Sequence, residues 1–156
     1  MTSKQDYQNK NKHNTKYYRR QMSKYLSTYN QIKEGIRFKE EDIQNLEKEY
    51  FEACPAVHKI NKTGVSWTIE DKRKYMANKI KADIAIDKIH IKQMERCLFI
   101  VQKEKYYDII PLYYFEHNTI EAIAEKLYCD TVTVYRNKNA LLDKMIVCYF
   151  GARSIL

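Results

Sequence analysis

Hydrophobic residues recur at intervals of seven along a first long stretch of the sequence, from about Thr15 to Ala53. Such a repeat, with further apolar residues between its members, predicts a long helix with a coiled-coil seam. Gly35 is the position where this helix is most easily divided, because glycine is a poor helix former. Cys54 and Pro55 end the stretch, since a residue before proline disfavours the helical conformation. The apolar positions of this first seam are Met22, Tyr25, Tyr29, Ile32, Ile36, Ile43, Leu46 and Tyr50.

A second stretch with helical spacing follows a polar loop, Pro55–Trp67, and continues to about Lys105. Thr68 and Asp71 mark its start, because a hydroxyl at the cap position and a carboxylate three residues later form a capping box. The two long helices form either a hairpin within one chain or a coiled coil between two chains, and periodicity does not distinguish these. The apolar positions of the second seam are Ile80, Ile84, Ile91, Met94, Leu98 and Val101.

Each seam contains one charged residue, Lys39 in the first and Asp87 in the second. In an antiparallel hairpin, both residues lie at a similar distance from the loop. We therefore expect the two side chains to face each other and to fix the register of the helices. A buried pair of this kind specifies alignment more than it adds stability.

Two shorter amphipathic helices joined by a tight turn are predicted between Asn118 and Met145. Asn118 and Glu121 predict a capping box for the first helix, and Asp130 predicts a cap for the second. A small side chain lets two helices approach closely, and apolar neighbours fill the wedge between them. Two short helices that cross in this way are typical of a DNA-binding helix-turn-helix. The wedge residues are Ile123, Ala124, Leu127 and Val134.

Four short sequences in the last third of the chain carry a family resemblance. They are Tyr113–Phe115, Thr119–Leu127, Thr133–Arg136 and Tyr149–Gly151. In these sequences the chain resembles phage transcriptional regulators of the ArpU/RinA type, whose carboxyl-terminal part is similar to the fourth, DNA-binding region of bacterial sigma factors.

Two positions depart from the pattern of that family. Tyr128 stands where the turn often has glycine, so the turn either avoids a left-handed conformation or adopts it at a cost of about 1 kcal/mol. Asn137 stands where the recognition helix usually has an apolar residue. We expect the stem of Lys138, or Leu141, to fill the space at that position.

The patterns and the resemblance together predict an all-α protein. Two long amino-terminal helices, as a hairpin or a coiled coil, would precede a three-helix helix-turn-helix like the fourth region of sigma factors. The expected division is a disordered basic tail at 1–14, a hairpin or coiled-coil region at 15–104, and a helix-turn-helix DNA-binding domain at 105–156.

The resemblance also implies a function. It indicates a sequence-specific DNA-binding transcriptional regulator, in the role of an activator, of phage or prophage late, packaging or lysis genes. Double-stranded DNA is the implied partner. The long helices would contact host RNA polymerase or a second copy of the chain, as a homodimer.

Two other functions stay open at this point. The DNA-recognition (small) subunit of a phage packaging terminase also joins a helix-turn-helix to oligomerisation helices. A helical adaptor that binds proteins and not DNA would use the two short helices only as core. A complete sigma factor would need a second, promoter-melting region, for which the cluster Tyr17–Arg20 is too small.

The predicted DNA contacts follow from position within the second short helix. Arg136 could bind a guanine edge, Asn139 an adenine edge, and Val132 a thymine methyl group. Tyr135 has an alternative role, in which its ring packs against Leu127 or the preceding helix. The predicted base-reading residues are Thr131, Val132, Tyr135, Arg136 and Asn139. The predicted phosphate contacts, which set orientation, are Thr119, Lys126, Lys138 and Lys144.

Composition adds three points. The net charge of +8 and the pI near 9.2 favour a polyanionic partner,, although many Lys-rich helical proteins without a nucleic-acid role share them. No apolar run is long enough to span a bilayer, and no secretory signal is visible, so we expect a cytoplasmic protein without a membrane partner. Histidine spacing, carboxylate pairs and glycine loops give no indication of an enzyme or a cofactor. The cysteines lack the paired spacing of a zinc site, and we expect three of them to be small core residues: Cys97, Cys129 and Cys148,.

Overall fold

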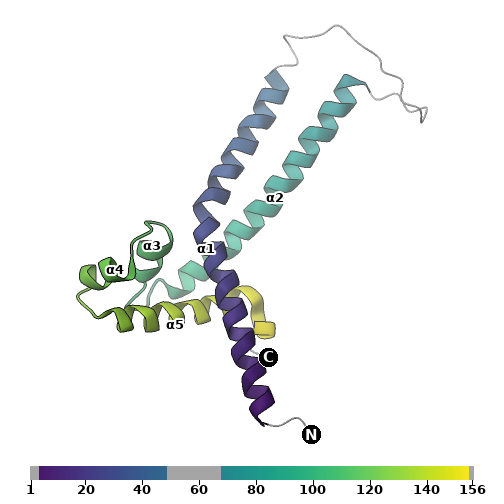
Figure 1. Ribbon diagram of the computed structural model, residues 1–156. Helices are drawn as coiled ribbons and strands as arrows, with labels where there is room; N and C mark the ends of the chain where they lie inside the picture. Colours follow the sequence, from purple (N-terminus) through teal and green to yellow (C-terminus); the bar gives the residue numbers. More distant parts are fainter. Residues whose placement is uncertain (1–3, 49–67, 155–156) are drawn as a thin grey trace. The chain divides into compact units, whose positions relative to one another are not determined.

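The structure, a computed structural model, describes residues 4–48 and 68–154 of the chain (Figure 1). Its elements in chain order are α1 (Lys4–Lys48), α2 (Ile69–Val101), α3 (Ile109–Tyr114), α4 (Ile120–Lys126), α5 (Thr131–Phe150) and the short 3-10 helix η2 (Gly151–Ser154). No β-strand occurs in either described range. The prediction of an all-α protein with two long amino-terminal helices is therefore confirmed. In the same ranges, no helix combines the length and the apolar composition that a membrane span requires.

The long helices differ from their predicted bounds at three points. α1 begins at Lys4, so residues 4–14 are helical where the sequence suggests a disordered tail. The helix also continues through Gly35 without interruption. α2 ends at Val101, a turn earlier than predicted. Three predicted features lie outside the described residues: the loop Pro55–Trp67, Cys54 and the seam residue Tyr50.

The chain forms two compact units. Unit 1 consists of Met1–Asn30 together with Ile91–Leu156, and unit 2 consists of Gln31–His90. This division differs from the expected one, in which residues 15–104 form one region and residues 105–156 another. The difference arises because the first part of α1 and the last part of α2 pack with the carboxyl-terminal helices.

Unit 2 is an antiparallel helical hairpin formed within one chain (Figure 1). Ile36 of α1 and Ile84 of α2 are its buried residues. The Lys39 ammonium lies 2.6 Å from Oδ2 of Asp87, which raises the pKa of Lys39 through their hydrogen bond. The predicted pairing of these two charged residues across the hairpin is therefore confirmed. A second ion pair, Lys88 with Glu40 at 2.6 Å, lies beside it.

The first turn of α2 is closed by the predicted capping box. The backbone N–H of Asp71 donates to Oγ1 of Thr68 at 3.0 Å, and the backbone N–H of Thr68 donates to Oδ2 of Asp71 at 3.0 Å. The Thr68 hydroxyl also donates to Oδ2 of Asp71 at 2.7 Å, and this bond, with the one from the Thr68 backbone, favours the ionised carboxylate and lowers the pKa of Asp71,. The capping box explains why α2 starts at Ile69,.

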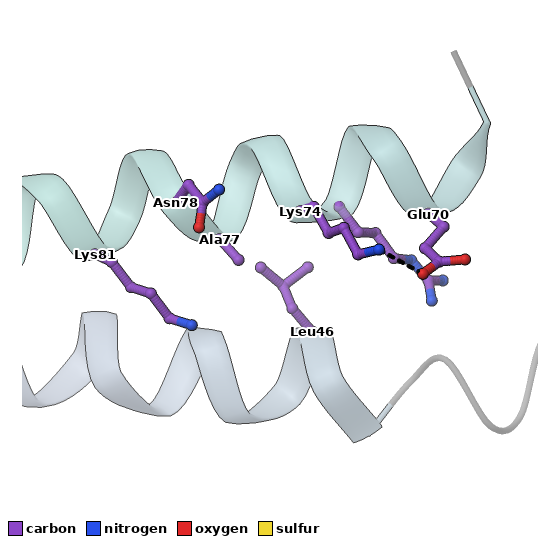
Figure 2. Close-up of a pocket in the computed structure, with 7 residues that line it drawn as sticks. Leu46, Glu70, Lys74, Ala77, Asn78 and Lys81 are labelled. Carbon is purple, nitrogen blue, oxygen red and sulfur yellow. Dashed lines mark ion pairs between the residues drawn. The ribbon is translucent and has the colours of Figure 1, made fainter.

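Figure 2 shows the end of unit 2 where α1 finishes and α2 begins. Leu46 points from α1 toward Ala77 of α2, and longer charged side chains surround this contact. An ion pair joins Lys74 to Glu70 within α2 at 2.8 Å. Leu46 is only half-buried. The apolar contact between the two helices is therefore thin at this end of the hairpin.

Unit 1 has a core to which α1 contributes together with α2 and the shorter helices. Met22 and Leu26 of α1 are fully buried. Tyr29 reaches two elements, because its hydroxyl donates to Oε1 of Glu95 in α2 at 3.1 Å and its ring stacks on Phe115 at 5.4 Å. This part of the first seam is thus covered by the carboxyl-terminal region as well as by α2. The other fully buried side chains of this core are Met94, Cys97, Val101, Ile109, Ile110, Ile123, Val134, Leu142 and Met145.

Two residues of the cluster Tyr17–Arg20, Tyr18 and Arg19, attach α1 to α5. The Arg19 guanidinium donates to both carboxylate oxygens of Asp143, at 2.7 and 2.6 Å. The ring of Tyr18 packs on that of Phe150, with centroids 4.8 Å apart. A bidentate pair such as that of Arg19 with Asp143 fixes the orientation of the two side chains as well as their distance. Tyr18 and Arg19 therefore have a structural role within unit 1.

Candidate nucleic-acid interface

The residue that caps α4 lies one position later than predicted. Oγ1 of Thr119 accepts from the backbone N–H of Ala122 at 3.2 Å, so Thr119 is the capping residue. Asn118 instead donates through its side-chain amide to the carbonyl of Leu112 at 3.1 Å. The chain turns at His117, whose φ is 56°, and this turn brings Asn118 back toward α3. The predicted capping box of Asn118 with the residue three positions later is therefore wrong.

The turn between α4 and α5 places Tyr128 in a left-handed conformation. Its φ is 51°. Its backbone N–H donates to Glu125 at 3.2 Å, and that of Cys129 donates to the carbonyl of Ala124 at 3.0 Å. These two bonds form the Schellman motif that usually ends in glycine. The turn therefore does not avoid the left-handed conformation at Tyr128 but adopts it, with the strain that a side chain causes there. Its side chain is 98% exposed, so no burial compensates for the strain.

The predicted cap of α5 is confirmed. Oδ1 of Asp130 accepts from the backbone N–H of Thr133 at 2.6 Å, and Oδ2 accepts from the Thr133 hydroxyl at 2.9 Å. Both bonds favour the carboxylate and lower the pKa of Asp130,. The first turn of α5 is thereby fixed at the end that the helix-turn-helix model would present to DNA.

The wedge between α4 and α5 is filled largely as predicted. Ile123, Ala124 and Val134 are buried, and Leu127 is half-buried. The half-buried side chain of Asn137 donates to the carbonyl of Thr133 at 2.8 Å, so its amide is satisfied within α5. Lys138 and Leu141, the two residues expected to fill the space at that position, both have buried side chains.

The outward face of the first two turns of α5 is exposed. Val132 is 73% exposed and Tyr135 is 53% exposed, and Arg136 also faces solvent. No ion pair joins Arg136 to another residue in the described ranges. Thr131 and Asn139 are half-buried at the edges of this face. The five predicted base-reading residues therefore lie on one helix segment, and three of them are exposed.

The residues predicted to hold phosphates are not gathered in the same way. Thr119 is exposed but its hydroxyl is used as the cap of α4. Lys126 donates to Oδ1 of Asn118 at 3.3 Å, and Lys144 pairs with Glu104 at 2.6 Å. Both lysines are exposed, so these contacts can exchange for others.

Lys138 is the exception among the predicted phosphate contacts. It is only 9% exposed, and its ammonium lies 3.9 Å from the centroid of the Tyr113 ring and 5.2 Å from that of Tyr135. Cation–π contact of this kind stabilises a charge that has been withdrawn from water. Lys138 thus packs α5 on α3 and has no surface to offer a phosphate.

The net positive charge of the chain does not come from the region that contains α4 and α5. Residues 105–156 contain six basic and six acidic residues, so the net charge of +8 belongs to residues 1–104. The excess is concentrated at the start of the chain, where residues 1–30 contain seven Lys or Arg and one Asp. A count of charge by segment, rather than for the whole chain, is the signal that reveals this asymmetry.

The cysteines differ in their surroundings. Cys97 is buried, and burial together with the neighbouring Cys148 thiol raises its pKa. Cys129 is half-buried and Cys148 is exposed, so the prediction that Cys148 is a core residue is wrong. Within the described part of the chain, no group of three or more His, Cys, Asp or Glu side chains is arranged to hold a metal ion.

The chain matches no protein-family model, no curated protein and no solved structure. Its similarity to the ArpU/RinA-type regulators accordingly stays a resemblance carried by the four short sequences given above.

Proposed function

We propose that this protein is a sequence-specific DNA-binding transcriptional regulator in which α5 is the recognition helix. The observation that carries the proposal is the exposed face of its first two turns, where Val132, Tyr135 and Arg136 face solvent on a helix capped by Asp130 and wedged against α4. A helix of this kind enters the major groove with its amino-terminal end first. Rigid support behind the reading face is what a recognition helix needs.

The chemistry of this face fits base edges. The Arg136 guanidinium can donate two hydrogen bonds to a guanine, and Asn139 can both donate to and accept from an adenine. Val132 offers a branched apolar surface for the methyl group of thymine. Lys126 and Lys144 are the exposed cations of this region that could exchange their present partners for phosphates,.

The regulatory role rests on the resemblance. As in the ArpU/RinA-type regulators, the protein would bind near a promoter and activate late, packaging or lysis genes of a phage or prophage. The hairpin of unit 2 would then contact host RNA polymerase or a second copy of the chain.

A protein-binding adaptor is the second candidate, and two observations favour it. Residues 105–156 have no net charge. Tyr128, Val132 and Tyr135 also expose aromatic and apolar surface, which is typical of protein interfaces. The two candidates differ in their response to salt, because phosphate contacts weaken steeply as salt rises.

Selection from a random duplex pool with the purified protein tests the proposal. We expect enrichment of a short motif, whose symmetry reports the assembly: a palindrome indicates a homodimer and a single half-site indicates a monomer. Failure to enrich any sequence, together with the absence of salt-sensitive binding to duplex, would favour the adaptor.

Variants then locate the contacts. Arg136→Ala should weaken binding to the selected duplex by about 1 to 3 kcal/mol and relax the preference at one base pair. Lys126→Ala should weaken all duplexes evenly and reduce the salt dependence. Arg96→Ala is the matched control, because Arg96 is an exposed arginine on α2, which does not form part of the reading face. Equal and purely salt-dependent effects of Arg136→Ala and Lys126→Ala would show that Arg136 binds phosphate.

A further inference from the structure

The reading face of α5 continues along the helix, but α1 partly covers its second half. Val132, Arg136, Asn139 and Asp143 follow one another at intervals of four, three and four, and therefore lie on one side of the helix. The first two of them are exposed. Asp143 instead accepts both hydrogen bonds from Arg19 of α1.

Aromatic contacts extend this cover to the end of α5. Phe150, seven residues beyond Asp143, packs on Tyr18 at 4.8 Å, and Tyr149 packs on Tyr25 at 5.2 Å. Figure 1 shows α1 crossing α5 near the carboxyl-terminal end of α5. Within unit 1, α1 thus lies over α5 on the same side as the exposed reading residues.

The face of α1 that is turned away from α5 then points in the same direction as the reading face of α5. Lys16, Arg20 and Lys24 are spaced by four residues and form one stripe on α1,. They lie about half a turn away from Met22 and Tyr25, which face the core of unit 1. All three basic residues are exposed. We call these three residues the α1 basic stripe.

The α1 basic stripe carries charge without a counterpart in the protein. No ion pair joins Lys16, Arg20 or Lys24 to another residue in the described ranges. Residues 1–30, which contain the stripe, hold seven basic residues and one acidic residue, whereas residues 105–156 are neutral. Neutralising phosphates supplies essentially all of the non-specific affinity of a DNA-binding protein and a large share of its specific affinity. The α4–α5 pair offers few such contacts, because Lys138 is buried and only two of the lysines predicted to hold phosphates, Lys126 and Lys144, are exposed.

We propose that the α1 basic stripe binds the phosphate backbone of duplex DNA beside the sequence that α5 reads. The inference rests on the proposed function of α5. Asp143, where α1 contacts α5, lies roughly 16 Å along the helix from Val132 at 1.5 Å per residue,, whereas the major groove is roughly 8.5 Å deep. With the amino-terminal end of α5 in the groove, α1 stands at the level of the phosphates rather than of the bases. Charge complementarity and this offset together select the DNA backbone as the partner of the stripe.

The test compares salt dependence in the full-length protein. The triple variant Lys16→Gln, Arg20→Gln, Lys24→Gln is measured beside a control triple, Lys72→Gln, Lys79→Gln, Lys81→Gln, which removes the same charge from exposed positions of α2. Binding of the selected duplex and of a scrambled duplex is followed by fluorescence anisotropy at several salt concentrations. Circular dichroism establishes that each variant retains its helix content.

The stripe variant should bind both duplexes more weakly by the same factor. Its slope of log Kobs against log salt concentration should be shallower by about 2.7, because each lost phosphate contact removes about 0.9. The control triple should keep the slope of the parent protein. As a check independent of the triple variant, Arg20→Gln alone should lower the slope by about 0.9, and Arg20→Lys should keep it.

Three results would overturn the proposal, and they separate it from the function on which it rests. If the parent selects a motif and the stripe variant keeps the parent slope, the stripe does not bind DNA, although the recognition helix still does. If the stripe and control variants lose slope equally, only the total charge matters. If the parent shows no salt-sensitive binding to any duplex, the stripe and the proposed function fail together.

Discussion

The left-handed turn residue Tyr128 allows a direct test of the geometry between α4 and α5. Replacing it by glycine removes the clash that a side chain causes at a φ of 51°,. The backbone bonds of the turn, from the amides of Tyr128 and Cys129, are kept. The side chain is 98% exposed, so its removal deletes no packing. The substitution therefore changes the backbone preference and little else.

The expected gain is the difference between two opposing effects. A non-glycine residue in the left-handed region costs about 1 to 2 kcal/mol. Glycine gains more conformational freedom in the unfolded chain, which offsets roughly 0.5 to 1 kcal/mol of that relief. Tyr128→Gly should therefore stabilise the protein by about 0.5 to 1 kcal/mol. For a chain of this size, this corresponds to an increase in Tm of about 1 to 4 °C.

Urea unfolding followed by circular dichroism measures this difference as a shift in midpoint. Tyr128→Ala is the control, because alanine removes the same ring but keeps the strain, and it should stay within about 0.5 kcal/mol of the parent. Two results would refute the reasoning. One is a Tyr128→Gly variant that is no more stable than the parent, and the other is an alanine variant that gains as much as the glycine variant.

Three further predictions concern the other elements. Gly35→Ala should stabilise the protein by about 1 kcal/mol in the same assay, since alanine is the better helix former and the added carbon meets no atom within 4 Å,. Gly151→Ala should instead destabilise the protein, because a side chain is strained at the φ of 66° that Gly151 adopts,. The double variant Lys39→Asp, Asp87→Lys should be more stable than the two single reversals together predict, by about 0.5 to 1 kcal/mol. Additive effects in this double-mutant cycle would exclude a pair that sets the register. The pKa of Asp130 lies below its ordinary value of 3.8, so its contribution to stability is complete above that pH and is lost as the pH falls further through the pKa of the folded protein. Asp130→Asn, which keeps a cap but cannot titrate, should unfold with a weaker dependence on pH in this range; an unchanged pH profile would argue against the bond to the first turn of α5.

The hairpin is the part of the fold that sequence patterns could predict in most detail. A repeat of seven identifies the apolar side of each long helix, and the position of a charge within each repeat then fixes the register. This is why Lys39 and Asp87 could be paired without a structure. The capping box of Thr68 and Asp71 could be predicted because it depends only on four consecutive residues.

The packing of α1 on α5 could not be predicted in the same way. A repeat shows that one side of a helix is apolar, but it does not show which segment covers that side. Met22 and Tyr29 follow the repeat, yet they lie in the core of unit 1. Tyr18 and Arg19 extend the contact surface beyond the predicted seam, and this greater width is the sign that more than one helix packs there.

Single-residue details of the candidate site also depended on tertiary structure. Asn118 and Thr119 are both good capping residues, and the turn at His117 decides between them. Lys138 has the sequence position of a phosphate contact, but the ring of Tyr113 comes from another helix and holds its ammonium. Helix spacing specifies which residues share a face, whereas the neighbouring helix decides which of them remain accessible.

The division of unit 1 between two distant parts of the chain has a consequence for folding. Arg19 and Asp143 are 124 residues apart in sequence, whereas Lys39 and Asp87 in the hairpin are 48 apart. Closing the longer loop costs about 0.8 kcal/mol more in chain entropy, so the hairpin should form first and bring the two segments of unit 1 together. During synthesis, the rings of Tyr18 and Tyr25 lack their partners on α5 until Tyr149 and Phe150 have been made. A chain interrupted before α5 would expose those rings to chaperones, proteases or other unfinished chains.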